Sequence, residues 1–267
     1  MTCRIATRYF LAALIAGATA CADSTSPAGG VTEASLTRDA GADAADVTAQ
    51  DLSQMFSDEQ TGGLAMSADP LPAPRSGCTY SPATGRFVCP TVGREGLTIS
   101  RSFAIYAGGI AQSAYDAAAT DSLNFQTSLV GSVSRDDRTV WLNTTRNMTL
   151  SGLAGAETER TWNGLGTRSD SAHITSDGIA RRTRVRSTDR ISSVVVGLPR
   201  SANPFPKSGT ITHDIELSST ADNGSGTRAR TATRHVVVTF NGTRIASVLV
   251  GTTACALDLV THRMSCR

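Results

Sequence analysis

Residues 227–250 read TRARTATRHVVVTFNGTRIASVLV, and this stretch decides the fold class. Two runs rich in β-branched residues, 227–241 and 243–250, meet at the dipeptide Asn241-Gly242. Asn and Gly both tolerate the positive φ angles of a tight turn, so the pattern predicts a β-hairpin with a two-residue loop. Similar runs, separated by short turn signals, recur through most of the chain.

The chain from Ser76 onward is therefore predicted to be all-β. The strands expected before this hairpin are 97–106, 122–133, 139–150, 157–165, 169–175, 179–197 and 209–219. No connection between them has the length of a βαβ crossover, so we expect one domain, residues 76–267, built as an antiparallel meander. Such a meander would form a β-sandwich or a partly open barrel. Residues 107–119 contain alanines that suit a helix, but Gly108, Gly109 and Asp116 favour a loop.

The N-terminus has the pattern of a secretion signal. Arg4 and Arg8 precede an apolar run over residues 10–20, which is too short to span a bilayer. The small residues at the end of the run suit an ordinary signal peptidase, which would cut before Cys21. We therefore expect residues 1–20 to be a signal peptide and the mature chain to begin at Cys21.

Ala18-Thr19-Ala20-Cys21 also resembles the lipobox of bacterial lipoproteins, in which the cysteine is acylated. This resemblance covers the leader only, and the body resembles no characterised family. It implies a lipid on Cys21 and attachment to a membrane. Ala22, in place of an inner-membrane retention Asp, favours the outer membrane, with the protein facing the periplasm or the cell surface. After ordinary cleavage Cys21 would instead be a free thiol, a liability in an oxidising compartment.

The other four mature cysteines form two pairs with the same spacing, Cys78 with Cys89 and Cys255 with Cys266. In a hairpin with a four-residue loop, each pair lies directly opposite, at a separation that a disulfide bridges. The same register pairs Tyr80 with Phe87, Leu257 with Met264, and Asp258 with Arg263, which are favourable cross-strand pairs. A zinc site would need closer cysteine spacing, so we expect two structural disulfides.

Between Cys21 and the body lies an acidic segment. Residues 22–75 carry nine acidic and two basic residues, a net charge of −7, and low hydrophobicity. This composition predicts a disordered, flexible tether over residues 21–75. Within it, residues 46–58 place Val47, Leu52, Met55 and Phe56 on one helical face, with Thr48 and Asp51 at capping-box spacing. The segment either docks on the body or a partner, or forms a transient helix, which we favour because short isolated helices are marginal in water.

The body has the opposite charge. It carries 21 basic and 14 acidic residues, a net charge of +7, and every basic residue except Lys207 is Arg. Alternation places Arg182, Arg184, Arg186 and Arg190 on one face of a strand, and Arg228, Arg230 and Arg234 on one face of another. These arginines are candidates for binding an anionic glycan, lipid phosphate or the acidic tether. The alternative is a solvated face paired with Asp and Glu. Export argues against nucleic acid as a partner.

No motif of a known catalytic, cofactor or metal site is present. His173, His213, His235 and His262 lie on separate predicted strands or loops, so we expect no metal site and no cofactor. Trp141 and Trp162 are predicted to fill the core. The hypothesis is a non-enzymatic, lipid-anchored envelope protein with a binding or structural role, whose partner is a glycan or an envelope protein. The alternatives are a binding module for an anionic glycan or lipid, and a hydrolase that unites a His with Asp or Glu from distant positions.

Overall fold

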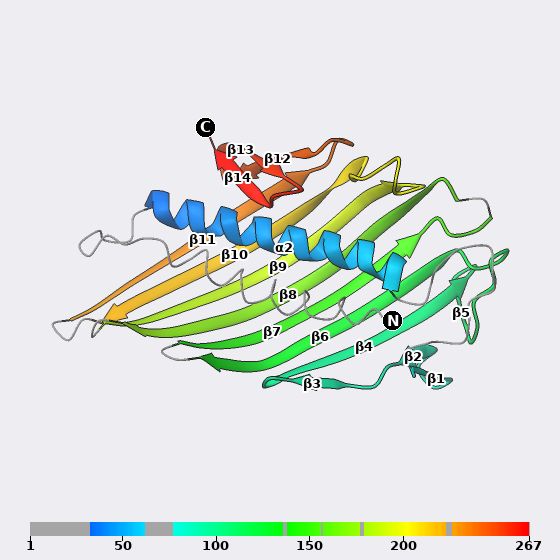
Figure 1. Cartoon of the computed structure of the whole chain (residues 1–267), viewed down its shortest axis with the longest axis horizontal. Helices are drawn as coiled ribbons and strands as arrows, with labels where there is room; N and C mark the ends of the chain where they lie inside the picture. Colours follow the sequence, from blue (N-terminus) through cyan, green and yellow to red (C-terminus); the bar gives the residue numbers. More distant parts are fainter. Residues whose placement is uncertain are drawn as a thin grey trace, which may run out of the picture.

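The computed structural model describes residues 33–61 and 77–266, apart from 136–137, 156, 177–178 and 223–225. A single antiparallel sheet makes up the body, and one long helix lies across one of its faces (Figure 1). The predicted signal peptide, Cys21, residues 22–32 and 62–75 of the predicted tether, and Ser76 lie outside the described residues. No helix among the described residues is both long and apolar enough to cross a membrane.

The helix α2 spans Glu33–Thr61. The strands are β1 (Thr79–Ser81), β2 (Arg86–Val88), β3 (Val92–Arg94), β4 (Leu97–Ala107), β5 (Ile110–Gln112), β6 (Ser122–Arg135), β7 (Arg138–Ser151), β8 (Glu159–Ser176), β9 (Ile179–Gly197), β10 (Ser208–Asp222), β11 (Thr227–Thr239), β12 (Ile245–Val250), β13 (Thr253–Asp258) and β14 (Arg263–Cys266). From β6 to β14, each strand pairs with the next strand in the chain, so this part of the sheet is a simple meander, and β6 also pairs with β4. The predicted antiparallel all-β fold is confirmed, as one sheet that is not closed into a barrel.

Most predicted strands are present, with two differences. The two strands expected over 157–165 and 169–175 are one continuous strand, β8, because Gly166 and Thr167 stay in the ladder opposite β7. The expected loop over 107–119 is present, but it contains the short strand β5, which folds back on β4.

The hairpin at Asn241-Gly242 forms, but the prediction of a two-residue loop is wrong. The last ladder pair of β11 and β12 is Thr239 with Ser247. Beyond it, the amide of Phe240 donates to Gly209 of β10, and that of Gly242 donates to Pro206. The chain therefore stays alongside β10 at Phe240, whose side chain is buried, and turns only after this residue.

Both predicted disulfides are confirmed. Cys78 is bonded to Cys89 and Cys255 to Cys266. The predicted cross-strand register is also correct in both hairpins, which have the expected four-residue loops. Because each hairpin is local in sequence, spacing and residue type were sufficient to predict it.

The acidic segment differs from the prediction. Residues 33–61, expected to belong to a disordered tether, form α2, and Val47, Leu52 and Met55 are buried against the sheet. The segment docks on the body, which is the alternative that we did not favour. The helix extends beyond residues 46–58 because Ala-rich sequence precedes them, and Ala has the highest helix propensity. Thr48 and Asp51 lie within the helix and not at its start, so they form no capping box.

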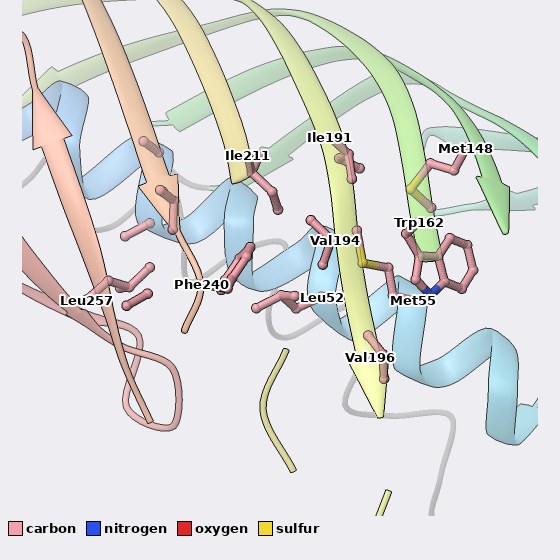
Figure 2. Packing of buried hydrophobic residues seen from close by; sticks show 14 of the residues in the cluster. Leu52, Met55, Met148, Trp162, Ile191, Val194, Val196, Ile211, Phe240 and Leu257 are labelled. Carbon is pink, nitrogen blue, oxygen red and sulfur yellow. The ribbon is translucent and has the colours of Figure 1, made fainter. Parts of the chain in front are cut away.

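The core lies between α2 and the sheet. Figure 2 shows Leu52 and Met55 of the helix among Trp162, Val194 and Ile211 of the sheet. Burying a side chain such as Leu or Met contributes roughly 1.5–3 kcal/mol, so this contact stabilises a helix that would be marginal alone. We call the side of the sheet that α2 covers the helix face, and the opposite side the open face.

Candidate functional site

A buried network of polar side chains joins α2 to three strands. Arg146 of β7 donates from Nε to Asp51 Oδ1 at 2.7 Å and from Nη1 to Asp189 Oδ2 of β9 at 3.0 Å. His213 of β10 lies between Asp189 and the helix: its Nδ1 is 2.9 Å from Asp189 Oδ1, and its Nε2 is 2.9 Å from Thr48 Oγ1. We call Thr48, Asp51, Arg146, Asp189 and His213 the latch network.

A glycine in the neighbouring strand leaves space for the Arg146 side chain of this network. Gly166 of β8 lies opposite Arg146, and a Cβ at this glycine would be 2.3 Å from Nη1 of Arg146. Next to the network, Arg168 of β8 pairs with Asp43 of α2, while its Nε is 3.6 Å from Asp170 Oδ2. Two arginines of the sheet thus hold two aspartates of the helix. The acidic segment therefore binds arginines of the body, and the two described pairs use Arg146 and Arg168, which the sequence analysis did not single out.

The charges in the network stabilise one another. Burial alone would raise the pKa of Asp189, but its hydrogen bond to His213 and the charge of Arg146 outweigh burial and hold the pKa below its usual value. Burial likewise disfavours the charged form of Arg146, and the carboxylates of Asp51 and Asp189 overcome this and raise its pKa. Outside the network, burial raises the pKa of Asp170 to about 6, although the charge of Arg168 opposes this.

Thr48, His213 and Asp189 have the order of a hydroxyl, imidazole and carboxylate catalytic triad. They bring a His and an Asp together, as the hydrolase alternative requires. However, Thr48 and His213 are 0% exposed and Asp189 is 1% exposed, so none of the three reaches solvent. Thr48 also lies on the helix that covers the other two, so lifting the helix to admit a substrate would remove the hydroxyl. The arrangement therefore suits a contact that holds the helix better than a site that admits a substrate.

Sequence reasoning missed the latch network, although a signal was present. In β7, Arg146 alternates in phase with Met148 and Leu150, which are buried on the helix face. In β10, His213 likewise lies between Ile211 and Ile215. A polar residue at an apolar position of a strand indicates a buried partner, because an unpaired buried charge is costly. The sequence could not identify that partner, since it lies on a distant segment.

The two arginine-rich strand faces lie on opposite sides of the sheet. In β9, Arg182, Arg184, Arg186 and Arg190 alternate with the buried residues and are exposed on the open face. In β11, Arg230 and Arg234 are in phase with buried Ala232 and Val236, so they lie on the helix face. The backbone of Arg228 has the same phase, and its side chain lies outside the description. The seven arginines therefore do not form one surface.

The open face contains a hollow of about 610 Å³ around two of these arginines. It is lined by Trp141 of β7, Ser171 and His173 of β8, Arg182 and Arg184 of β9, and Ser218 and Thr220 of β10, together with Ala172 and Thr183. The expectation that both tryptophans fill the core holds for Trp162, which is 0% exposed, and is wrong for Trp141, which is 45% exposed. The two tryptophans differ in exposure because strand alternation places Trp141 on the open face and Trp162 on the helix face.

The described residues that line this hollow include no carboxylate. Arg184 lies opposite Ser171 and Ser218, and Arg182 lies opposite His173 and Thr220. The next arginine along the strand, Arg186, lies opposite Glu216 and fits the alternative of a solvated, paired face. We call Trp141, Arg182, Arg184 and the hydroxyl residues beside them the basic hollow.

The four histidines are not brought together. His173 lines the basic hollow, His213 is in the latch network, His235 bonds Asp214 on the open face, and His262 is in the loop between β13 and β14. Among the described residues, no group of three or more His, Cys, Asp or Glu side chains could hold a metal ion. Comparison with known proteins found no matching family model, no matching curated protein and no matching solved structure.

Proposed function

We propose that this chain is an exported, lipid-anchored envelope protein that acts by binding a partner on the open face of its sheet, without catalysis. The lipid would be on Cys21, and the outer membrane is the proposed location, facing the periplasm or the surface. The observation that carries the binding role is the difference between the two faces of the sheet. The helix face carries the buried core that packs against α2, whereas the open face presents a basic hollow with an exposed tryptophan.

The non-enzymatic part of the proposal is supported by the state of the latch network. Its hydroxyl, imidazole and carboxylate are buried and bonded to one another, and each joins the helix to the sheet or supports a residue that does. Buried polar groups contribute to stability when they are paired, as the side chains of Thr48, His213 and Asp189 are. A binding protein can use them in this way, whereas a hydrolase needs them to reach a substrate.

The anchor is tested by the intact mass of the protein purified from bacterial membranes. We expect a mature chain that begins at Cys21 and carries the mass of attached acyl chains, and a Cys21→Ser variant that is absent from the membrane fraction. An unmodified Cys21 thiol, or an uncleaved leader, would refute lipidation. Protease treatment of whole cells then shows which side of the membrane the body faces.

The binding surface is tested with a photo-crosslinking amino acid at Thr188, which is exposed on the open face. The matched position is Ser53, which is exposed on α2 on the other side of the sheet. We expect crosslinked adducts in living cells from position 188 and not from position 53. Adducts from position 53 alone, or equal adducts from both, would contradict binding on the open face.

The hydrolase alternative rests on the geometry of Thr48, His213 and Asp189, and it makes a distinct prediction. A fluorophosphonate probe, which labels activated hydroxyl nucleophiles, would label Thr48 if the helix opens during turnover. We expect no labelling above that of a Thr48→Val variant, in which the side chain keeps its shape but lacks the hydroxyl. Labelling of Thr48 that is lost in this variant would overturn the non-enzymatic proposal.

A further inference from the structure

The basic hollow brings two cations next to an exposed aromatic ring. Arg182 and Arg184 are two residues apart in β9, so their side chains project from the same face of the sheet. Trp141, two strands away in β7, lines the same hollow and is 45% exposed. A guanidinium group pairs with a carboxylate or phosphate through two parallel hydrogen bonds. An indole ring presents an apolar face on which a ligand ring can stack.

The remaining lining narrows the class of ligand. Ser171, Ser218 and Thr220 are opposite the two arginines and supply hydroxyl groups. Each hydroxyl can donate and accept a hydrogen bond, which suits a ligand that itself carries many hydroxyls. The volume of about 610 Å³ lies within the usual range for sites that bind small molecules or short oligomers.

We propose that the basic hollow binds an anionic sugar, in which a carboxylate or phosphate pairs with Arg182 and Arg184 while the ring stacks on Trp141. The proposal rests on the proposed function, because it takes the open face as the binding surface, and it adds the ligand class and the residues. A sugar fits better than a flat bilayer, because the cations, hydroxyls and indole line a concave hollow that a single ring can enter.

The arginines of the hollow differ in their cross-strand neighbours from arginines that are paired with carboxylates on a solvated sheet face. Their cross-strand neighbours are hydroxyls and His173, whereas Arg186 lies opposite a carboxylate, Glu216. Two adjacent guanidinium groups without a lining carboxylate repel each other, and a bound anion relieves that repulsion. The hollow is therefore the part of the open face with the strongest physical reason to bind an anion.

The test measures binding of trigalacturonic acid to the mature chain carrying Cys21→Ser, by calorimetry and by tryptophan fluorescence. The chain has two tryptophans and Trp162 is 0% exposed, so a fluorescence change on binding reports Trp141. We expect binding that weakens with added salt. Arg182→Gln and Arg184→Gln should each weaken it about tenfold, because each removes a charge-assisted hydrogen bond. Trp141→Ala should weaken it and abolish the fluorescence change.

The controls test separately the charge of the ligand, its sugar ring and the position of the arginine. Methyl-esterified trigalacturonate has the same size without the charge and should bind at least about tenfold more weakly. Arg190→Gln, on the same face outside the hollow, should bind like the unmodified chain. Binding of glucose 6-phosphate shows whether the hollow accepts a phosphate group on a sugar ring. Comparison with inorganic phosphate shows whether the sugar ring is needed for binding.

Three results would overturn the proposal: no binding of any anionic sugar at low salt, equal binding of the methyl ester, or an equal loss in Arg190→Gln. Retention on phosphatidylglycerol vesicles without sugar binding would assign the hollow to lipid headgroups instead. Crosslinks from position 188 in cells, without sugar binding, would refute this inference and leave the proposed function standing. Sugar binding by a chain whose Cys21 is unmodified in cells would support this inference and refute the lipid anchor of the proposed function.

Discussion

Arg146 connects the helix to the sheet through two buried ion pairs. Its side chain is 7% exposed and bonds one carboxylate from α2 and one from β9. A buried ion pair contributes little net stability compared with an apolar pair, because both groups lose their hydration. Removal of one partner is a different case, since it leaves the remaining charges buried and unpaired. Arg146 should therefore be far less replaceable than its exposed counterparts.

We expect Arg146→Met to lower the free energy of unfolding by about 3–5 kcal/mol, because Asp51 and Asp189 lose their shared cation. Urea unfolding measures this, with Arg190→Met on the open face as the matched control, where a change within about 0.5 kcal/mol is expected. Gly166→Ala should have an intermediate effect, since its Cβ would displace the Arg146 guanidinium without removing it. Equal losses in Arg146→Met and Arg190→Met would show that the latch network does not hold the fold.

Asp170 predicts how stability changes with pH. Its pKa of about 6 in the folded chain lies above the usual 3.8, so between these values the folded state binds a proton that the unfolded state has lost. The contribution of Asp170 to stability therefore rises as pH falls from 7 toward 4, by up to about 2 kcal/mol. Asp189 has the opposite sign: its lowered pKa contributes stability above about pH 4, and this is lost in stronger acid.

The measurement compares unfolding free energies at pH 7 and pH 5 for the unmodified chain and for Asp170→Asn. Asparagine keeps an acceptor for the amide of Asn143, which donates to Asp170 at 3.2 Å, but it does not titrate. The unmodified chain should become more stable relative to the variant at pH 5. A difference between the two proteins that does not change with pH would contradict the raised pKa.

At the scale of elements, α2 depends on the C-terminal hairpin as well as on the latch network. Gly41 of the helix faces Met264 of β14 so closely that a Cβ at Gly41 would be 2.1 Å from the methionine Cε. The disulfide between Cys255 and Cys266 ties β14 to β13 at this place. The other disulfide closes the β1–β2 hairpin at the opposite end of the sheet (Figure 1).

The two disulfides should therefore affect the helix differently. Replacement of Cys255 and Cys266 by Ser should speed amide hydrogen exchange in residues 33–61, because β14 is free to leave the helix. The same replacement of Cys78 and Cys89 is the matched control, and it should lower global stability by a similar amount, up to about 3 kcal/mol, without a selective effect on α2. Equal protection of α2 in both double variants would contradict a role for the C-terminal hairpin in docking.

At the scale of the whole molecule, the docked helix limits how far the body can lie from a membrane. If Cys21 is lipidated, eleven residues separate it from the start of α2, and they span at most about 40 Å when fully extended. Release of α2 would allow all of residues 22–75 to act as tether. The docked helix then limits the distance between the membrane and the open face, whereas a fully flexible tether would leave this distance variable.

Met55→Asp tests this, because Met55 is 0% exposed and a carboxylate there would be buried without a partner. We expect weaker energy transfer between labelled lipids and a fluorescent amino acid at position 188 in the lipidated variant, as the body moves away from the bilayer. Ser53→Asp, at an exposed position of the same helix, is the control and should keep the transfer unchanged. Unchanged transfer in Met55→Asp, with the helix shown to be released by hydrogen exchange, would refute the tether model.

Much of the fold was predictable because it depends on neighbours in the chain. Strand alternation, turn residues and cysteine spacing predicted the antiparallel meander and the register of both disulfide hairpins. The open-face exposure of Arg182 and Arg184 follows from the same alternation, once the buried phase of β9 is known. The basic hollow was only partly predictable, since the sequence indicated the arginines but placed Trp141 in the core.

By itself, then, the sequence determined the all-β class, the meander order and the two disulfides, because each follows from residues close together along the chain. Only the tertiary structure decided that residues 33–61 are a docked helix, that Thr48 and Asp51 meet His213 and Arg146, and that the two arginine-rich strand faces point to opposite sides. The physical reason is the same in each case. Burial against a distant segment stabilises the acidic helix α2, and it pairs charges whose partners cannot be identified from the local sequence pattern.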